Sequence, residues 1–108
     1  MFVLAVVDDM FFASKIRAVA EAVGVEISFP RTKESVIEKA RQADLVIVDL
    51  QGQRVDPLSL PTELPGVRLI GFLSHVEVEL QRKALAAGYD QVMPRSVFSR
   101  DLAQILSK

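Results

Sequence analysis

Two unbroken apolar runs, each ending in aspartate, constrain the fold of this 108-residue chain more than any other feature. Residues 45–48 are four large apolar side chains, and Asp49 follows them directly. Residues 2–7 form a second run, which ends in Asp8 and Asp9. A short continuous apolar run favours a strand that is buried on both faces. The aspartates therefore stand where buried strands reach the surface, which in open parallel sheets is the side where sites form.

The rest of the chain alternates between helix and strand patterns. Helices are expected over residues 11–23, from an N-cap at Thr32 to about Ala43, over residues 76–87 and in a last helix capped by Ser99; strands are expected over residues 25–29, 67–73 and 89–93. Prolines at 57, 61 and 65 leave room for at most one helical turn between residues 51 and 65, so the third helix is short or missing. Such alternation predicts a five-stranded parallel sheet between two helix layers.

Composition excludes several classes of protein. The length suits one domain, residues 1–108. No apolar run approaches the roughly 18 residues needed to cross a bilayer, and Asp8 and Asp9 interrupt the first run too early for a signal peptide, so a cytoplasmic location is expected. A formal net charge of −1 offers no overall attraction to nucleic acid or anionic membranes. The absence of cysteine excludes disulfides and thiolate metal sites.

The strand ends bring six polar residues to one edge of the predicted sheet: Asp8, Asp9, Asp49, Ser74, His75 and Arg95. Three neighbouring carboxylates repel one another, which raises the pKa of at least one of them unless a cation joins the group. Mg²⁺ suits such a set, because it prefers carboxylate, carbonyl, water and phosphate oxygens. With Mg²⁺ bound, an aspartate can attack phosphorus, while a hydroxyl and a cation across the edge hold the phosphoryl oxygens.

Over nearly its whole length the chain resembles the receiver domains of two-component response regulators. The resemblance rests on residues 6–9, 46–49, Ser74 and 86–90. It implies an α/β fold with a doubly wound parallel sheet, flavodoxin-like strand order 2-1-3-4-5 and helices on both faces. It also implies a signalling domain whose only catalysis is self-phosphotransfer and autodephosphorylation. The implied partners are a histidine kinase or phosphotransfer protein and a downstream protein, with no direct binding to nucleic acid or membrane.

The same resemblance implies roles for individual residues. Asp49 matches the position that accepts a phosphoryl group from a histidine kinase, and Ser74 matches the hydroxyl residue that meets this group. Asp8 and Asp9 match the acidic pair that holds Mg²⁺, with Asp9 as the more direct ligand. Asp49 and the backbone carbonyl of Gln51 complete the metal shell.

Several positions depart from the pattern of that family. Arg95 stands at its lysine position and Ser96 at the proline that follows; Val92 replaces an aromatic switch residue, Pro94 comes one residue early, and His75 stands where a small residue is usual and crowds the entry to Asp49. Arginine keeps the positive charge, but its planar fork differs from a compact ammonium. These departures motivate an alternative function, a degenerate receiver that binds a partner without phosphorylation.

Simpler interpretations apply to each residue taken alone. Aspartates or a serine after a strand are often helix caps, and a lone arginine is often a surface cation. A third carboxylate at the end of a second buried strand favours a metal and phosphoryl site instead. A flavin-binding protein or small hydrolase on this fold is disfavoured, because residues 8–12 are bulky and anionic where a phosphate-binding turn is rich in glycine. Phe12 is expected in the core, and Met10 or Phe11 on an exposed contact surface.

Overall fold

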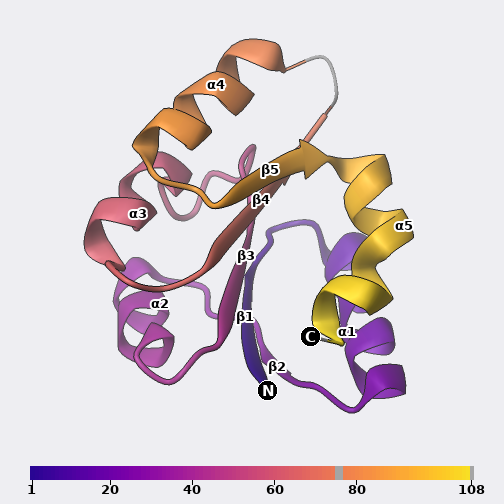
Figure 1. Cartoon of the computed structure of the whole chain (residues 1–108). Helices are drawn as coiled ribbons and strands as arrows, with labels where there is room; N and C mark the ends of the chain where they lie inside the picture. Colours follow the sequence, from indigo (N-terminus) through magenta and orange to yellow (C-terminus); the bar gives the residue numbers. More distant parts are fainter. Residues whose placement is uncertain (75–76, 108) are drawn as a thin grey trace.

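The computed structural model describes residues 1–74 and 77–107, which form an α/β fold around one sheet (Figure 1). Its elements are β1 (Phe2–Val6), α1 (Met10–Val23), β2 (Glu26–Ser28), α2 (Lys33–Ala40), β3 (Leu45–Asp49), the 3₁₀ turn η1 (Pro57–Ser59), α3 (Leu60–Glu63), β4 (Leu69–Leu73), α4 (Val78–Ala87), β5 (Gln91–Pro94) and α5 (Arg95–Leu106). The prolines between β3 and β4 leave only η1 and the four-residue α3, which confirms the expectation of a short third helix.

All five strands are parallel and lie in the order β2-β1-β3-β4-β5, as predicted. Helices α1 and α5 cover one face of the sheet, and α2, α3 and α4 cover the other (Figure 1). The central strand, β3, is buried at all five positions, including Asp49. The central position of β3 explains its apolar run, because each face of the strand packs against a layer of helices.

Each face of the sheet has its own apolar core. On the face of α1 and α5, three aromatic rings pack together: the Phe72 centroid lies 5.0 Å from that of Phe12 and 4.7 Å from that of Phe98. These rings come from β4, α1 and α5, so the cluster joins the sheet to both helices. Phe12 is buried, as expected, whereas Met10 and Phe11 are 72% and 92% exposed.

The N-cap at Thr32 is confirmed, because its side chain accepts a hydrogen bond from the amide of Ser35. The expected cap at Ser99 is wrong: α5 begins at Arg95, and Ser99 lies inside it. The earlier start places Phe98 on the helix and in the core, where a loop would have left it outside the apolar stripe.

Several element ends differ from the predicted bounds by one to three residues. Strand β2 covers only Glu26–Ser28, because it pairs with β1 alone, and α2 ends at Ala40 instead of residue 43. Pro94 closes β5 instead of following it. His75 and the expected start of a helix at residue 76 lie outside the described residues. None of the described helices is long and apolar enough to cross a membrane.

The absence of a side chain at Gly71 in β4 lets the Leu50 side chain pack closely against this strand, and substitution of Gly71 tests that packing. A Cβ at this position would lie 2.8 Å from Leu50 Cδ1, within the buried layer next to β3. Gly71→Ala is therefore expected to lower the free energy of unfolding by about 1–3 kcal/mol through overpacking, measured by urea denaturation. The same substitution should cost less in a Leu50→Ala background, where the clashing methyl groups are gone. An equal cost in both backgrounds would contradict this account.

Candidate functional site

The site is built from the ends of two neighbouring parallel strands. Strands β1 and β3 pair with Val6 opposite Val48, so the residues that follow β1 lie beside Asp49 at the end of β3. Asp49 is 6% exposed and is the buried charged residue of the described chain. Parallel pairing alone therefore places a buried carboxylate next to the acidic pair of the β1–α1 connection.

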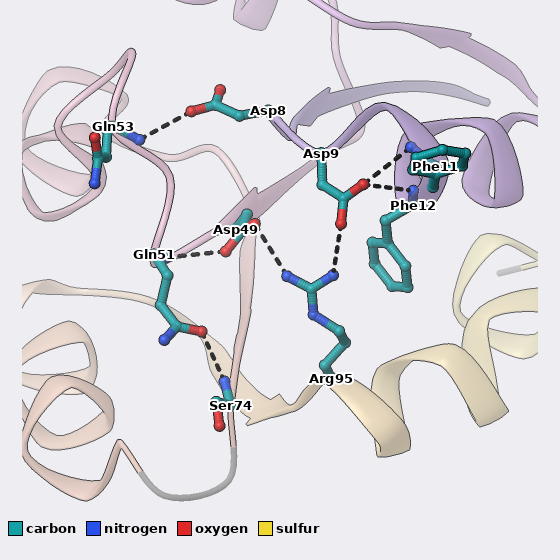
Figure 2. Close-up of polar contacts among 9 residues, drawn as sticks. All are labelled: Asp8, Asp9, Phe11, Phe12, Asp49, Gln51, Gln53, Ser74 and Arg95. Atoms are coloured by element: carbon teal, nitrogen blue, oxygen red, sulfur yellow. Dashed lines mark hydrogen bonds and ion pairs between the residues drawn. The ribbon is translucent and has the colours of Figure 1, made fainter.

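Two donors bind the Asp49 carboxylate (Figure 2). The backbone amide of Gln51 donates to Oδ1 at 3.0 Å, and Nη2 of Arg95 donates to Oδ2 at 3.3 Å. Burial nevertheless raises the pKa of Asp49, with smaller contributions in the same direction from Asp8 and Asp9. The Gln51 amide and the Arg95 charge lower this pKa but do not cancel the effect of burial. The carboxylate is thus held in a setting that favours further positive charge.

Arg95, the first residue of α5, joins the carboxylates of the two strand ends. Its Nη1 lies 3.5 Å from Oδ2 of Asp9, while Nη2 binds Asp49. Its Cζ lies 4.6 Å from the ring centroid of Phe12 and 5.2 Å from that of Phe72. Both ion pairs are long for charge-assisted hydrogen bonds, so the aromatic rings contribute to fixing the guanidinium in place.

Asp9 has two functions in this structure. Its Oδ1 accepts hydrogen bonds from the amides of Phe11 at 2.9 Å and Phe12 at 3.2 Å, which caps α1. Its Oδ2 faces Arg95 (Figure 2). The cap thus orients the second oxygen toward the site.

Asp8 points away from Asp9. Its Oδ2 accepts hydrogen bonds from the amides of Gln53 at 2.9 Å and Arg54 at 3.3 Å in the loop after β3 (Figure 2). Consecutive side chains on extended backbone project to opposite sides, which explains why the two neighbours diverge. The structure therefore brings Asp9 and Asp49 together at Arg95, with Asp8 against the loop. In residues 1–74 and 77–107, no three His, Cys, Asp or Glu side chains form a ready metal cluster.

The other predicted site residues lie around this centre. Gln51 follows β3, and its side-chain Oε1 accepts a hydrogen bond from the amide of Ser74 at 2.9 Å, which ties the loop after β3 to the end of β4. Ser74 and Arg95 line a cleft of about 560 Å³ between α1 and α5, together with Lys15 and Ser99. The cleft thus gathers serine hydroxyls and two cations, of which Arg95 also binds the buried carboxylate.

The sequence patterns missed the aromatic support of the site. The sequence predicts Phe12 as a core residue only and gives no role to Phe72, yet both lie under the Arg95 guanidinium. A signal was present for Phe72, because the parallel pairing of β3 with β4 places it directly opposite Asp49. No comparable sequence signal indicates that Arg95, which lies far from both phenylalanines in the chain, contacts their rings.

Comparison with known proteins identifies the fold. No protein-family model matches the sequence, and no curated protein matches it. Among solved structures, a CheY-like response regulator receiver domain from Methanospirillum hungatei JF-1 superposes with a TM-score of 0.78 at 21% identity, covering 97% of this chain and 89% of that one. A response regulator receiver protein from Burkholderia phymatum superposes with a TM-score of 0.74 at 23% identity, over 97% of this chain and 94% of that one. A signal receiver domain from Bermanella marisrubri superposes with a TM-score of 0.82 at 16% identity, over 97% of this chain and 93% of that one. The chain therefore has the receiver fold.

The raised pKa of Asp49 predicts how stability responds to pH. In the unfolded chain the pKa of Asp49 is near 3.8, and the folded protein keeps the proton to a higher pH. The ionised carboxylate therefore lowers the free energy of unfolding at neutral pH, and this loss disappears on acidification. Asp49→Asn removes this titration. Its free energy of unfolding minus that of the wild type should thus be most positive at neutral pH and fall as the pH drops through the raised pKa toward 3.8, measured by urea denaturation.

Asp101→Asn is the matched control for that measurement. A hydrogen bond from Arg100 lowers the pKa of Asp101, so the difference from wild type should change in the opposite direction, and only slightly because this pair is exposed. A difference for Asp49→Asn that does not vary with pH would contradict the burial argument.

Proposed function

Starting from the receiver fold, we propose that this chain is a receiver of two-component signalling in which Asp49 accepts a phosphoryl group. The supporting observation is the nearly buried carboxylate of Asp49 at the end of the central strand, paired with Arg95, and with Ser74 following the neighbouring strand β4. A carboxylate held in this way can act as a nucleophile, and a guanidinium and a hydroxyl at the same edge of the sheet are groups that can bind a phosphoryl group. The donor we propose is a phosphohistidine of a histidine kinase or phosphotransfer protein.

The chemical step needs only one bond exchange at phosphorus. A carboxylate oxygen of Asp49 attacks the phosphorus, a phosphorus–oxygen bond forms, and the bond from phosphorus to the histidine nitrogen breaks with its electron pair on nitrogen. The Ser74 hydroxyl and the Arg95 guanidinium bind the phosphoryl oxygens. Attack of water on the same phosphorus later restores the carboxylate and releases phosphate.

The donor set of the site fits Mg²⁺. Asp9 and Asp49 both direct an oxygen at one cation, here the guanidinium of Arg95, and burial leaves Asp49 short of positive charge. We expect Asp9 and Asp49 to hold the ion together with the Gln51 carbonyl. Asp8 would have to leave its hydrogen bonds with the Gln53 and Arg54 amides to take part. Bound there, Mg²⁺ would neutralise charge on the phosphoryl oxygens.

Arg95 provides a route from phosphorylation to a downstream protein. It directly follows β5, begins α5 and rests on the rings of Phe12 and Phe72. Phosphorylation adds negative charge at Asp49, which changes the balance of the ion pairs that Arg95 makes with Asp9 and Asp49. We propose that the resulting shift at β5 and α5 is what a partner detects.

One observation favours a second function, that of a degenerate receiver which binds its partner without phosphorylation. The Arg95 guanidinium already spans Asp9 and Asp49 and is stacked on aromatic rings. If this internal cation neutralises Asp9 and Asp49 permanently, the site is stable without Mg²⁺, and a partner could bind the protein without phosphorylation.

Phosphorylation with a small donor separates the two functions. Incubation with acetyl phosphate and Mg²⁺ is expected to add one phosphoryl group to the wild type and none to Asp49→Ala, measured by intact-protein mass spectrometry. Asp101→Ala, which removes an exposed carboxylate of α5, is the control and should be modified like the wild type. Beryllium fluoride should shift the amides near Asp49 and Ser74 in NMR spectra. Wild-type protein that gains no Asp49-dependent phosphoryl group would exclude the first function and support the second.

Substitution of Arg95 is expected to change metal binding and phosphorylation in opposite directions. Arg95→Gln removes the cation that shares the two carboxylates, so Mg²⁺ affinity should rise several-fold, measured by NMR titration of the amides near Asp9, Asp49 and Ser74. The same change removes a ligand of the phosphoryl group, so the rate of Asp49 phosphorylation should fall. Weaker Mg²⁺ binding in Arg95→Gln would show that the guanidinium does not compete for this position.

A further inference from the structure

A second polar cavity lies on the other side of the β1 terminus, where Asp8 points. It has a volume of about 110 Å³ and is enclosed by α1, the connection from β2 to α2 and the loop after β3. Its polar lining comprises Arg17, Arg31, Arg54, Ser14 and Asp8, and Phe29 lies beside them. Such a volume holds several waters, and so also a single phosphate-sized group.

The cavity gathers positive charge in a protein whose formal net charge is −1. Arg17, Arg31 and Arg54 come from three separate segments of the chain and line the same space. Within residues 1–74 and 77–107 none of these three guanidinium groups forms an ion pair with a carboxylate. By contrast, Arg82 and Arg100 each have one such ion pair, and Arg95 has two. All three are exposed residues, so solvent screens their mutual repulsion, and an anion in the space that they line would lower it further.

Asp8 offsets part of this positive charge, but in the part of the chain that the structure describes it forms no ion pair with the three arginines. Its Oδ2 accepts hydrogen bonds from the backbone amides of Gln53 and Arg54, so its charge is bound to the loop after β3 and not to a guanidinium of the cavity. The remaining walls include Val6, Val55 and Pro30, which are buried. Apolar walls reduce screening by water and thereby strengthen pairing between arginine and an anion.

Phe29 adds an aromatic surface next to the charges. The Cζ atom of Arg17 lies 4.7 Å from the centroid of the Phe29 ring, which holds this guanidinium at the cavity. An arginine fixed in this way offers paired N–H donors that match the oxygens of a phosphate group. A carboxylate brings one negative charge, whereas a phosphate monoester carries between one and a half and two at neutral pH and suits three cations better.

We propose that this cavity binds the phosphate group of a small phosphorylated molecule, at a site separate from the Asp49 centre. Arg31 and Arg54 pair with the phosphate oxygens from the two loops, and Arg17 closes the third side. A cavity of this size accepts the phosphate alone, so the rest of the ligand extends outward past Met10, a rim residue that is 72% exposed. This inference does not depend on phosphorylation of Asp49.

Titration of the whole chain with inorganic phosphate, pyrophosphate and ADP tests the proposal. At low ionic strength we expect saturable binding of one equivalent by calorimetry, with NMR shifts centred on the amides of Arg31, Gln53 and Arg54. Stronger binding of ADP than of pyrophosphate indicates a nucleotide as the source of the phosphate. Equal or weaker binding of ADP indicates a phosphate group without a base. Either result supports a phosphate site.

Arginine variants decide whether this cavity is responsible. Arg31→Gln and Arg54→Gln change exposed side chains, and each should weaken binding about tenfold or more, because each removes a charge-assisted contact. Arg82→Gln in α4 is the control with the same loss of charge, and its affinity should equal that of the wild type. The proposal is overturned if no probe saturates, if shifts centre on Asp49 and Arg95, or if all three variants weaken binding equally.

Discussion

The burial of the Asp49 charge is the constraint on which the site at the carboxyl end of the sheet depends. A carboxylate that is 6% exposed destabilises the fold unless hydrogen bonds and an opposite charge compensate for the lost water. The Gln51 amide and Arg95 supply part of that compensation, and the pKa of Asp49 remains raised. At the end of β3, therefore, an added cation or a covalent change at the carboxylate acts directly on a buried charge.

Arg95 links this electrostatic constraint to the packing of the core. Its guanidinium binds two carboxylates and lies over Phe12 and Phe72, which pack against each other below it. A planar guanidinium can stack on rings and donate along its edge at the same time, which a lysine ammonium cannot do. The arginine at this position is thus suited to the aromatic layer between α1, β4 and α5. Any change in its ion pairs acts on the start of α5 and the end of β5.

Much of this architecture could be predicted from local patterns. The runs that end in Asp9 and Asp49 indicated buried parallel strands, because only strands covered on both faces are apolar throughout. Asp49, Ser74 and Arg95 were assigned to one edge of the sheet, and the structure places them there. The cap at Ser99 was wrong, because a local cap signal was outweighed by burial of Phe98, a tertiary effect.

The sequence by itself determined the alternation of buried strands with helices, the carboxylate at the end of a buried strand and the residues at that edge of the sheet, because hydrophobic periodicity is local and crossover connections are right-handed. The strand order followed from the resemblance to receiver domains. Only the tertiary structure decided which of these residues meet. Asp8 and Asp9 are neighbours in sequence, yet one binds the loop after β3 and the other faces Arg95, because adjacent side chains diverge and distant loops supply their partners. The arginine cavity likewise exists only where three distant segments converge, a contact that no local pattern encodes.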